Sequence, residues 1–256
     1  MYSTWAARRR NVTLFWLSAI GVIGLAVYLL ISMYEPPSCF DKKFNQDEVA
    51  IDCGGVCARM CSSQIGQLSV AWTSSFEVSQ GMWSAFAYID NPNTEAYAPL
   101  SKYRFTLYDR AGEVITEVDG ETIISRNPML PVFEGRIQVG DRVPYRTEFV
   151  WLDEEQVWYK EKNFYEVIVQ EQVMKNASTK PEIQATVLNK TPYVITDVEV
   201  FVIVYDIHKN AIATSKTYVD SLSPRGKRNI TFSWPNPFGV QYERMELIVQ
   251  VPQQED

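Results

Sequence analysis

Residues 103–108 read YRFTLY and residues 198–205 read VEVFVIVY, so apolar side chains stand at every second position of both runs. This alternation is typical of a β-strand with one buried face, because successive side chains of a strand point to opposite faces. Each run ends in Tyr-Asp before a turn, and the second pair, Tyr205-Asp206, lies 97 residues after Tyr108-Asp109. That separation is about the length of a seven-stranded sandwich. The runs therefore predict two copies of one β-domain.

Similar alternation recurs elsewhere beyond residue 64, where no stretch sustains a helical period. The further runs are 83–89, 145–151, 165–170, 183–188, 230–234 and 245–251. Asn91 and Asn189 each follow a strand, where the amide can bond the turning backbone. The sequences EFVW at 148–151 and TFSW at 231–234 complete the apparent repeat. We expect an all-β fold with two tandem antiparallel sandwiches, at 65–171 and 172–256, with residues 173–181 as the connection.

The sequence FTLYD at 105–109 resembles, letter for letter, the F-x-L-Y-D signature of a family of small immunoglobulin-like sandwich domains. The second copy, VIVYD at 202–206, keeps Tyr-Asp and replaces Phe and Leu by valine. LSPRG at 222–226 is similar to the family's L-x-P-G turn, with one insertion. The resemblance implies an immunoglobulin-like topology. It implies no activity, because such sandwiches host many functions.

An apolar run at residues 12–33 contains no charged residue or histidine, and Arg8, Arg9 and Arg10 stand before it. Helical, it would reach about 33 Å, enough for a hydrocarbon core of about 30 Å. The arginines predict a cytoplasmic tip at 1–11, a transmembrane helix at 12–34 and extracytoplasmic residues 35–256. A cleaved signal peptide is the alternative, but its apolar core is about 7–15 residues long and needs a small-x-small cleavage site.

All four cysteines, Cys39, Cys53, Cys57 and Cys61, lie in the segment 35–64. On the outer side of a membrane such a cluster favours two disulfides, with three connectivities open. A zinc site would need two close cysteine pairs, whereas Cys39 stands alone. An iron–sulfur cluster is disfavoured by an oxidising exterior. We expect a small disulfide-rich segment.

The spacing of this segment resembles a short module of secreted and surface proteins, C-x-D-G-x-x-N-G-x-E-x-x-x-D-C-G-G-x-C-x-x-C. Here Lys42 and Gln46 replace two glycines, and one extra residue precedes Cys61. The resemblance implies a small cross-linked element rather than an activity.

Four oxygen-bearing residues of the module, Asp41, Asn45, Glu48 and Asp52, are weak candidates for a Ca²⁺ site, since hard cations need clustered oxygen ligands. Their spacing is not that of an EF-hand. The alternative is that these side chains cap turns by bonding backbone amides. Anchor, module and paired sandwiches together resemble uncharacterised single-pass envelope proteins of bacteria, which implies an architecture and a compartment.

Charge and composition exclude several functions. All 31 acidic residues lie beyond residue 34, so the ectodomain is acidic and would repel nucleic acid and anionic lipid headgroups. The single histidine, His208, falls in a turn, and the acidic run 153–155 fits an exposed turn. No nucleophile constellation or phosphate-binding loop is evident. We expect no enzyme and no cofactor.

Two binding roles remain. The first is a membrane-anchored module that binds or assembles an unidentified envelope protein, because edge strands of sandwiches readily pair with partners. The second is a carbohydrate-binding module, because sugars stack on exposed aromatic rings. Trp158 and Tyr159 are its best candidates, since they stand together among polar residues. The sequence specifies neither the partner nor the oligomeric state.

Overall fold

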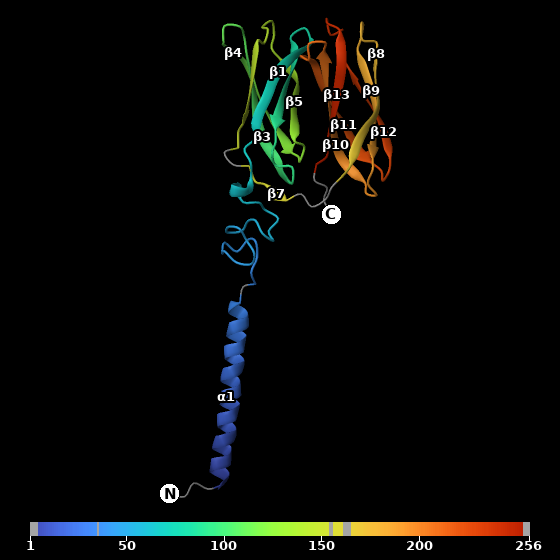
Figure 1. Cartoon of the computed structure of the whole chain (residues 1–256). Coiled ribbons are helices and arrows are strands. Elements are labelled where there is room, and N and C mark those ends of the chain that lie inside the picture. Colours follow the sequence, from blue (N-terminus) through green and yellow to red (C-terminus); the bar gives the residue numbers. More distant parts are fainter. Residues whose placement is uncertain (1–4, 35, 154–155, 161–164, 253–256) are drawn as a thin grey trace. The chain divides into compact units, whose positions relative to one another are not determined.

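The computed structural model describes residues 5–34, 36–153, 156–160 and 165–252. It is mostly β, with one N-terminal helix and antiparallel sheets, which confirms the expected fold class (Figure 1). Contacts divide the chain into two compact units, residues 1–56 and 57–256.

The first unit contains the helix α1 (Trp5–Met33). Its segment Arg8–Met33 is long and apolar enough to cross a membrane, and none of its most apolar window is buried against the protein. Apolar side chains that find no protein partner need another apolar medium. The expected long apolar helix is therefore present, and its length and composition suit a membrane span.

Beyond the helix the first unit consists of turns, with an isolated bridge between Ala50 and Cys53. Gly55 has a φ of +55°, and a Cβ there would lie 1.5 Å from the carbonyl oxygen of Asp47, so only glycine fits. Lys42 and Gln46 also have positive φ values, 59° and 53°. These are the two positions at which the resembling module has glycine.

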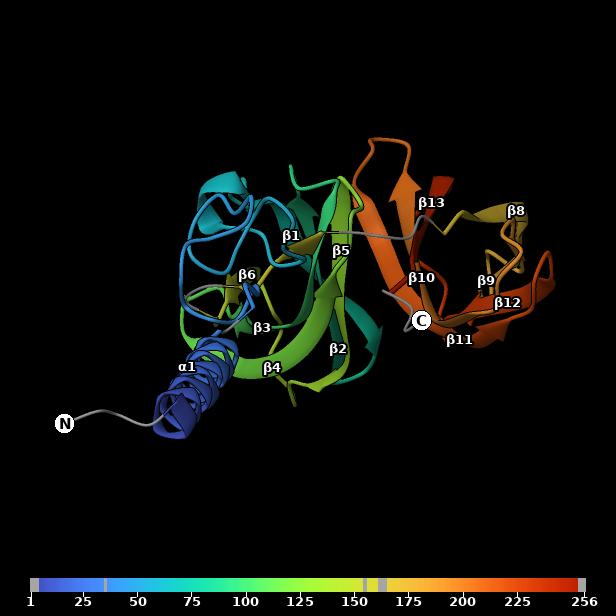
Figure 2. The same cartoon turned by 90° about the horizontal axis from the view of Figure 1, so that it is seen from below.

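The second unit begins with the 3-10 helix η1 (Ser62–Gln64) and the first sandwich. Its sheets have the orders β1-β2-β5 and β4-β3-β6, and the short β7 pairs with the start of β3. Figure 2 shows the two layers. The bounds are β1 (Ser69–Ser79), β2 (Met82–Asp90), β3 (Ala96–Tyr108), β4 (Val114–Ile124), β5 (Met129–Gln138), β6 (Arg146–Trp151) and β7 (Tyr159–Lys160).

The second sandwich repeats this topology, because its sheets have the orders β12-β9-β8 and β11-β10-β13. Each strand of the second sandwich therefore corresponds to the strand numbered seven lower in the first, so that β8 matches β1, β10 matches β3 and β13 matches β6. The bounds are β8 (Val167–Lys175), β9 (Glu182–Asn189), β10 (Ile195–Asp206), β11 (Ala211–Leu222), β12 (Lys227–Ser233) and β13 (Tyr242–Gln250). One proposed correspondence was wrong: Phe149 lies in β6 and Phe232 in β12, which is the counterpart of β5.

The boundary between the sandwiches also differs from the prediction. β8 begins at Val167 and pairs with β9, so residues 167–171 lie in a sheet of the second sandwich. The first three residues of the expected connection, 173–175, also belong to this strand, and 176–181 link it to β9. A register shift between Gln170 and Val173, with a φ of 55° at Glu171, interrupts the strand. This irregularity breaks the alternation in the sequence, which is why the strand appeared to end there.

Two equivalent asparagines join strand ends in the two sandwiches. Asn91 donates from its amide to the carbonyl oxygens of Ser125 (2.9 Å) and Asn127 (3.1 Å). Asn189 donates to the carbonyl oxygens of Leu222 (3.3 Å) and Ser223 (3.0 Å). Both asparagines are fully buried, and each connects the end of one sheet to the end of the other. The turn-bonding role expected of them is confirmed.

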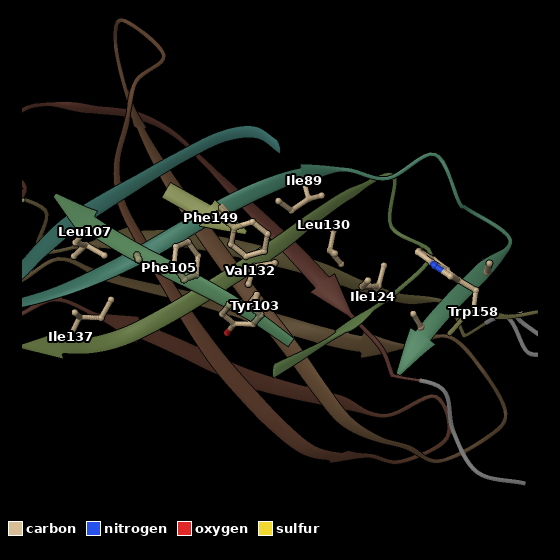
Figure 3. Packing of buried hydrophobic residues seen from close by; sticks show 14 of the residues in the cluster. Ile89, Tyr103, Phe105, Leu107, Ile124, Leu130, Val132, Ile137, Phe149 and Trp158 are labelled. Carbon is tan, nitrogen blue, oxygen red and sulfur yellow. The ribbon is translucent and has the colours of Figure 1, made fainter. Parts of the chain in front are cut away.

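Each sandwich has its own core. The first is filled by side chains from both sheets, among them Phe105 and Phe149 of β4-β3-β6 and Ile89 and Leu130 of β1-β2-β5 (Figure 3). The second is built mainly from valine and isoleucine of β9 and β10, closed by Phe232 and Trp234. Since each core draws on both of its sheets, each sandwich holds itself together.

Candidate functional site

The cysteine segment is closed by covalent bonds. All four cysteines are disulfide-bonded, which confirms the expectation of two disulfides. A disulfide sulfur does not supply the thiolate that zinc and iron–sulfur clusters require. The segment is therefore a cross-linked structural element.

The four calcium candidates bond the backbone around them. Asp41 accepts backbone N–H bonds from Ser38 (3.2 Å) and Lys43 (2.9 Å) and a bond from the Asn45 amide (2.7 Å). The hydrogen bond from the Asn45 amide lowers the pKa of Asp41 most. Burial acts in the opposite direction, but the Lys43 N–H adds to the lowering, so the pKa lies below its ordinary value. These contacts stabilise turns.

The other two carboxylates act in the same way. Both carboxylate oxygens of Asp52 accept the N–H of Lys42, at 3.0 and 3.1 Å. Glu48 is buried and accepts the N–H groups of Asn45 (3.4 Å) and Asp52 (3.3 Å). The geometry is that of the turn-capping alternative, and a calcium site at these residues stays a prediction.

The expected exposed aromatic pair is not an exposed pair. Trp158 is only 5% exposed and belongs to the core of the first sandwich, where Figure 3 places it at one end. Tyr159 is half-buried, with its ring centroid 5.8 Å from that of Tyr97. The polar residues around Trp158 in the sequence gave no sign of this burial. A sugar could not stack on the face of Trp158 in this structure.

Residues 158–160 instead connect the first sandwich to the end of the cysteine segment. The backbone N–H of Lys160 donates to the carbonyl oxygen of Ala58 (2.8 Å). The backbone N–H of Met60 donates to the carbonyl oxygen of Trp158 (2.9 Å). Tyr159 also pairs with Tyr97 of β3. The stretch is therefore a short strand between two neighbours, and its aromatic residues are structural.

The remaining residues considered for catalysis that the structure describes lie outside the strands. His208 is exposed in the hairpin between β10 and β11, where its N–H bonds the carboxylate of Asp206 at 2.8 Å. Asp153 accepts the backbone N–H of Lys102 at 2.6 Å. The rest of the acidic run, residues 154 and 155, lies outside the described residues.

A third apolar cluster lies between the sandwiches, and the alternation in the sequence did not predict it. The outer face of the β1-β2-β5 sheet packs against the outer face of the β11-β10-β13 sheet. The buried residues of this cluster are Phe76, Phe86, Tyr88, Phe201, Ile203 and Tyr205. β2 and β10 are consequently buried on both faces. We refer to these six residues as the inter-sandwich cluster.

Polar contacts at the edge of the inter-sandwich cluster fix the relative position of the sandwiches. Glu246 accepts the hydroxyls of Tyr88 (2.9 Å) and Tyr205 (3.1 Å), one from each sandwich. Burial, and next the charge of Glu246, raise the pKa of Tyr205 to about 12. The Arg244 guanidinium lies over the Tyr205 ring, 3.8 Å from its centroid. Gln250 donates to the Ile123 carbonyl oxygen (2.8 Å) across the same interface.

Comparison of the two copies shows which faces are built for contact. Phe201 and Ile203 of β10 correspond to Arg104 and Thr106 of β3, 97 positions earlier. Arg104 instead forms ion pairs with Asp119 (2.6 Å) and Glu117 (3.1 Å) on its own sheet. These two positions are therefore apolar in β10, which faces the other sandwich, and polar in β3, which does not. This difference between the repeats was visible in the sequence and identifies the contact face.

No protein-family model and no curated protein matches the chain. Several solved structures match the chain at low similarity. A red sea bream transglutaminase is 9% identical at a TM-score of 0.25, over 74% of this chain and 30% of that one. A Parabacteroides merdae β-glucuronidase is 14% identical at a TM-score of 0.24, over 69% of this chain and 26% of that one. A tandem CBM22 domain from Paenibacillus barcinonensis is 8% identical at a TM-score of 0.18, over 74% of this chain and 85% of that one. Similarity this low bears on neither activity nor ligand.

Proposed function

We propose that this protein is a membrane-anchored, extracytoplasmic interaction or assembly module of the cell envelope, without catalytic activity. The observation that carries the proposal is the apolar helix α1, whose most apolar window has no side chain buried against the protein. Three arginines precede its apolar core, which favours a cytoplasmic N-terminus. The paired sandwiches would then face the exterior.

The covalent chemistry supports this orientation. Both disulfides lie in the short segment that follows the helix, and disulfides persist on the oxidising side of a membrane. An acidic ectodomain would be repelled by anionic lipid headgroups, which favours a domain that stands clear of the bilayer.

The paired sandwiches support a binding role. The inter-sandwich cluster and Glu246 hold two domains as one body, which presents sheet edges and polar faces at a fixed geometry. A rigid, multi-sheet surface on a membrane anchor suits partner binding or display. The resemblance to envelope proteins with immunoglobulin-like domains agrees with this role. A carbohydrate-binding role is less well supported, since Trp158 is buried.

Chemical crosslinking in the native membrane, followed by mapping of the linked peptides, tests the proposal. We expect links between residues 65–252 and a defined partner protein. The matched control adds the crosslinker after detergent has dispersed the membrane, which should weaken links that depend on co-localisation. Links confined to residues 1–34, or none to any protein, would contradict an interaction role.

A further inference from the structure

The second sandwich is open along one side, between the edge strands β8 and β13. These strands end their respective sheets, and a groove of about 640 Å³ lies between them. Residues 167–172 of β8 and 244–249 of β13 line the groove, with Asn127 of the first sandwich at one end. We refer to this groove as the seam.

Apolar side chains of the core reach the solvent at the seam. Val167 and Val169 of β8, and Met245, Leu247 and Val249 of β13, pack against the core of the second sandwich. All five remain only partly buried. They recur at every second position of each strand, so a row of incompletely covered core residues follows the seam.

The first sandwich provides an internal comparison, because β1 and β6 are the counterparts of β8 and β13. There the inward-facing residues Thr147 and Phe149 of β6 are buried. The hydroxyl of Thr73 on β1 donates to the Thr147 carbonyl oxygen at 2.6 Å and joins the two edges. The same side of the same fold is thus closed in one copy and open in the other.

The two edges of the seam are not equally able to pair with a further strand. β8 carries the register shift between Gln170 and Val173, an irregularity that blocks regular pairing. β13 pairs with β10 without a shift from Arg244 to Gln250. Its Val249 carbonyl oxygen accepts a bond from the Asn127 side chain at 2.9 Å, and so points away from β10.

Backbone groups of alternate residues in an antiparallel strand point to the same side. Those of Met245 and Leu247 therefore point into the seam as well. β13 thus offers a regular edge at Met245 and Leu247, with the Val249 carbonyl oxygen already bonded to Asn127. This edge lies beside a row of half-covered apolar side chains with the same two-residue period.

We propose that the seam binds an extended segment of another protein, which pairs with β13 as an additional strand and places every second, apolar side chain against the exposed core residues. This inference rests on the proposed interaction role and specifies the partner's chemistry. Strand addition of this kind draws affinity from backbone hydrogen bonds and specificity from alternate side chains.

Two observations favour this occupant. The seam is continuous with the inter-sandwich interface, because Ile248 of β13 packs against the inter-sandwich cluster while its neighbours Leu247 and Val249 line the seam. Within the 256 residues, no stretch outside the described ranges exceeds four residues, whereas β13 spans nine. None of these stretches could supply a strand of that length.

Site-specific photocrosslinking of the full chain in its native membrane tests the proposal. A photoreactive amino acid replaces Met245, Leu247 or Val249 in turn, and Ile207, exposed in a hairpin of the same sandwich, is the control position. We expect all three seam positions to link to one segment of one other protein. The linked residue should move by two for each two-residue step along β13, and Ile207 should not reach that segment.

Several outcomes would overturn the seam proposal: steps of three or four residues, which indicate a helix, links to lipid alone, links within the same chain, links to a second copy, or no links. If partners are captured elsewhere on the ectodomain but not at the seam, the interaction role stands and the seam proposal fails. If no position captures a protein, both fail.

A substitution gives an independent readout. Leu247→Lys places a charge on the apolar wall of the seam and should reduce the photocrosslinking yield at Val249 about tenfold or more. Leu247→Met keeps the wall apolar and should leave the yield within about twofold. Thermal unfolding of both variants separates lost binding from lost folding. Equal yields in the two variants, with both folded, would contradict the proposal.

Discussion

At the scale of single residues, the turns of the cysteine segment contain residues with positive φ, a backbone conformation that glycine usually adopts. Lys42 and Gln46 have φ values of 59° and 53° and lie where the resembling module has glycine. A side chain in this region costs about 1 kcal/mol or more relative to glycine. The N–H of Lys42 nevertheless bonds both carboxylate oxygens of Asp52, so its conformation is tied to a specific contact.

Lys42→Gly should therefore stabilise the segment, because the N–H bond is kept and the strain is relieved. We expect the free energy of local opening, measured by amide hydrogen exchange over residues 36–56, to rise by about 1 kcal/mol. Lys43→Gly, at a neighbouring position without positive φ, should lower that free energy by about 0.5–1 kcal/mol. A loss of protection in Lys42→Gly would show that the lysine side chain itself supports the fold.

A second prediction at this scale concerns Asp109 in the β3–β4 hairpin. The Arg142 guanidinium, and next the N–H of Glu113, lower the pKa of Asp109 from its ordinary value of 3.8. A carboxyl group with a lowered pKa in the folded state contributes stability above its unfolded pKa and loses it as pH falls through the folded pKa. The free energy of unfolding should therefore decrease from about pH 4 downwards. Asp109→Asn and Arg142→Gln should both make this decrease shallower, as followed by denaturant titrations. Unchanged slopes in both variants would contradict the assignment.

At the scale of elements, the decisive feature is that β2 and β10 are buried on both faces. Val198, Val200, Val202 and Val204 point into the second core, while Phe201 and Ile203 point into the inter-sandwich cluster. Fully burying a large apolar side chain contributes about 1.5–3 kcal/mol. The contact between the sandwiches therefore contributes to the stability of both.

Phe201→Ala should consequently lower the free energy of unfolding by about 3–5 kcal/mol, because it leaves a cavity between two sheets. The matched control is Arg104→Ala at the equivalent position of the first sandwich, which removes solvent-screened ion pairs and should lower the free energy of unfolding far less. Denaturant unfolding of the full chain in detergent compares the two variants. Similar losses would mean that the sandwiches do not stabilise each other.

The sequence predicted strands well where the alternation was regular and less well where packing decided. The pattern at 103–108 gave β3, and the Asp109 and Asp206 turns followed. β4 was missed because Asp119-Gly120 resembles a turn. In fact Gly120 lies inside the strand, where a Cβ would come within 2.5 Å of the Tyr103 ring. The Tyr103 hydroxyl bonds Glu134 at 2.6 Å in that space, and only the fold reveals this requirement.

The functional candidates show the same limit. The four cysteines were sufficient to predict the disulfides, because composition and position decide that chemistry. Trp158 was misjudged because its polar neighbours in the sequence say nothing about the strand it joins. The inter-sandwich cluster could have been found by comparing the two copies. The position of Phe201 is occupied by Arg104 in the first copy, and the position of Tyr88 is occupied by Thr186 in the second.

At the scale of the whole molecule, the chain combines elements stabilised by different means. The sandwiches carry three apolar clusters, whereas residues 36–56 contain little buried apolar surface and depend on covalent bonds. Reduction should therefore act locally.

Intact mass after alkylation should show four additional modified thiols only when reductant is present. Limited proteolysis of the reduced protein should then cut within residues 36–56 and leave 65–252 protected, because the sandwiches have their own cores. Alkylation without reductant, or general digestion after reduction, would contradict this division.

The proposed topology, with α1 across a membrane and the sandwiches outside, can be measured directly through the lysines without any substitution. All lysines lie beyond residue 41, while the N-terminal amine lies before the helix. A membrane-impermeant amine reagent, applied to cells whose outer barriers have been removed but whose cytoplasmic membrane is intact, should label exposed lysines such as Lys209 and Lys227 and spare the N-terminal amine until lysis. Labelling of the N-terminal amine before lysis, with both lysines protected, would contradict the account.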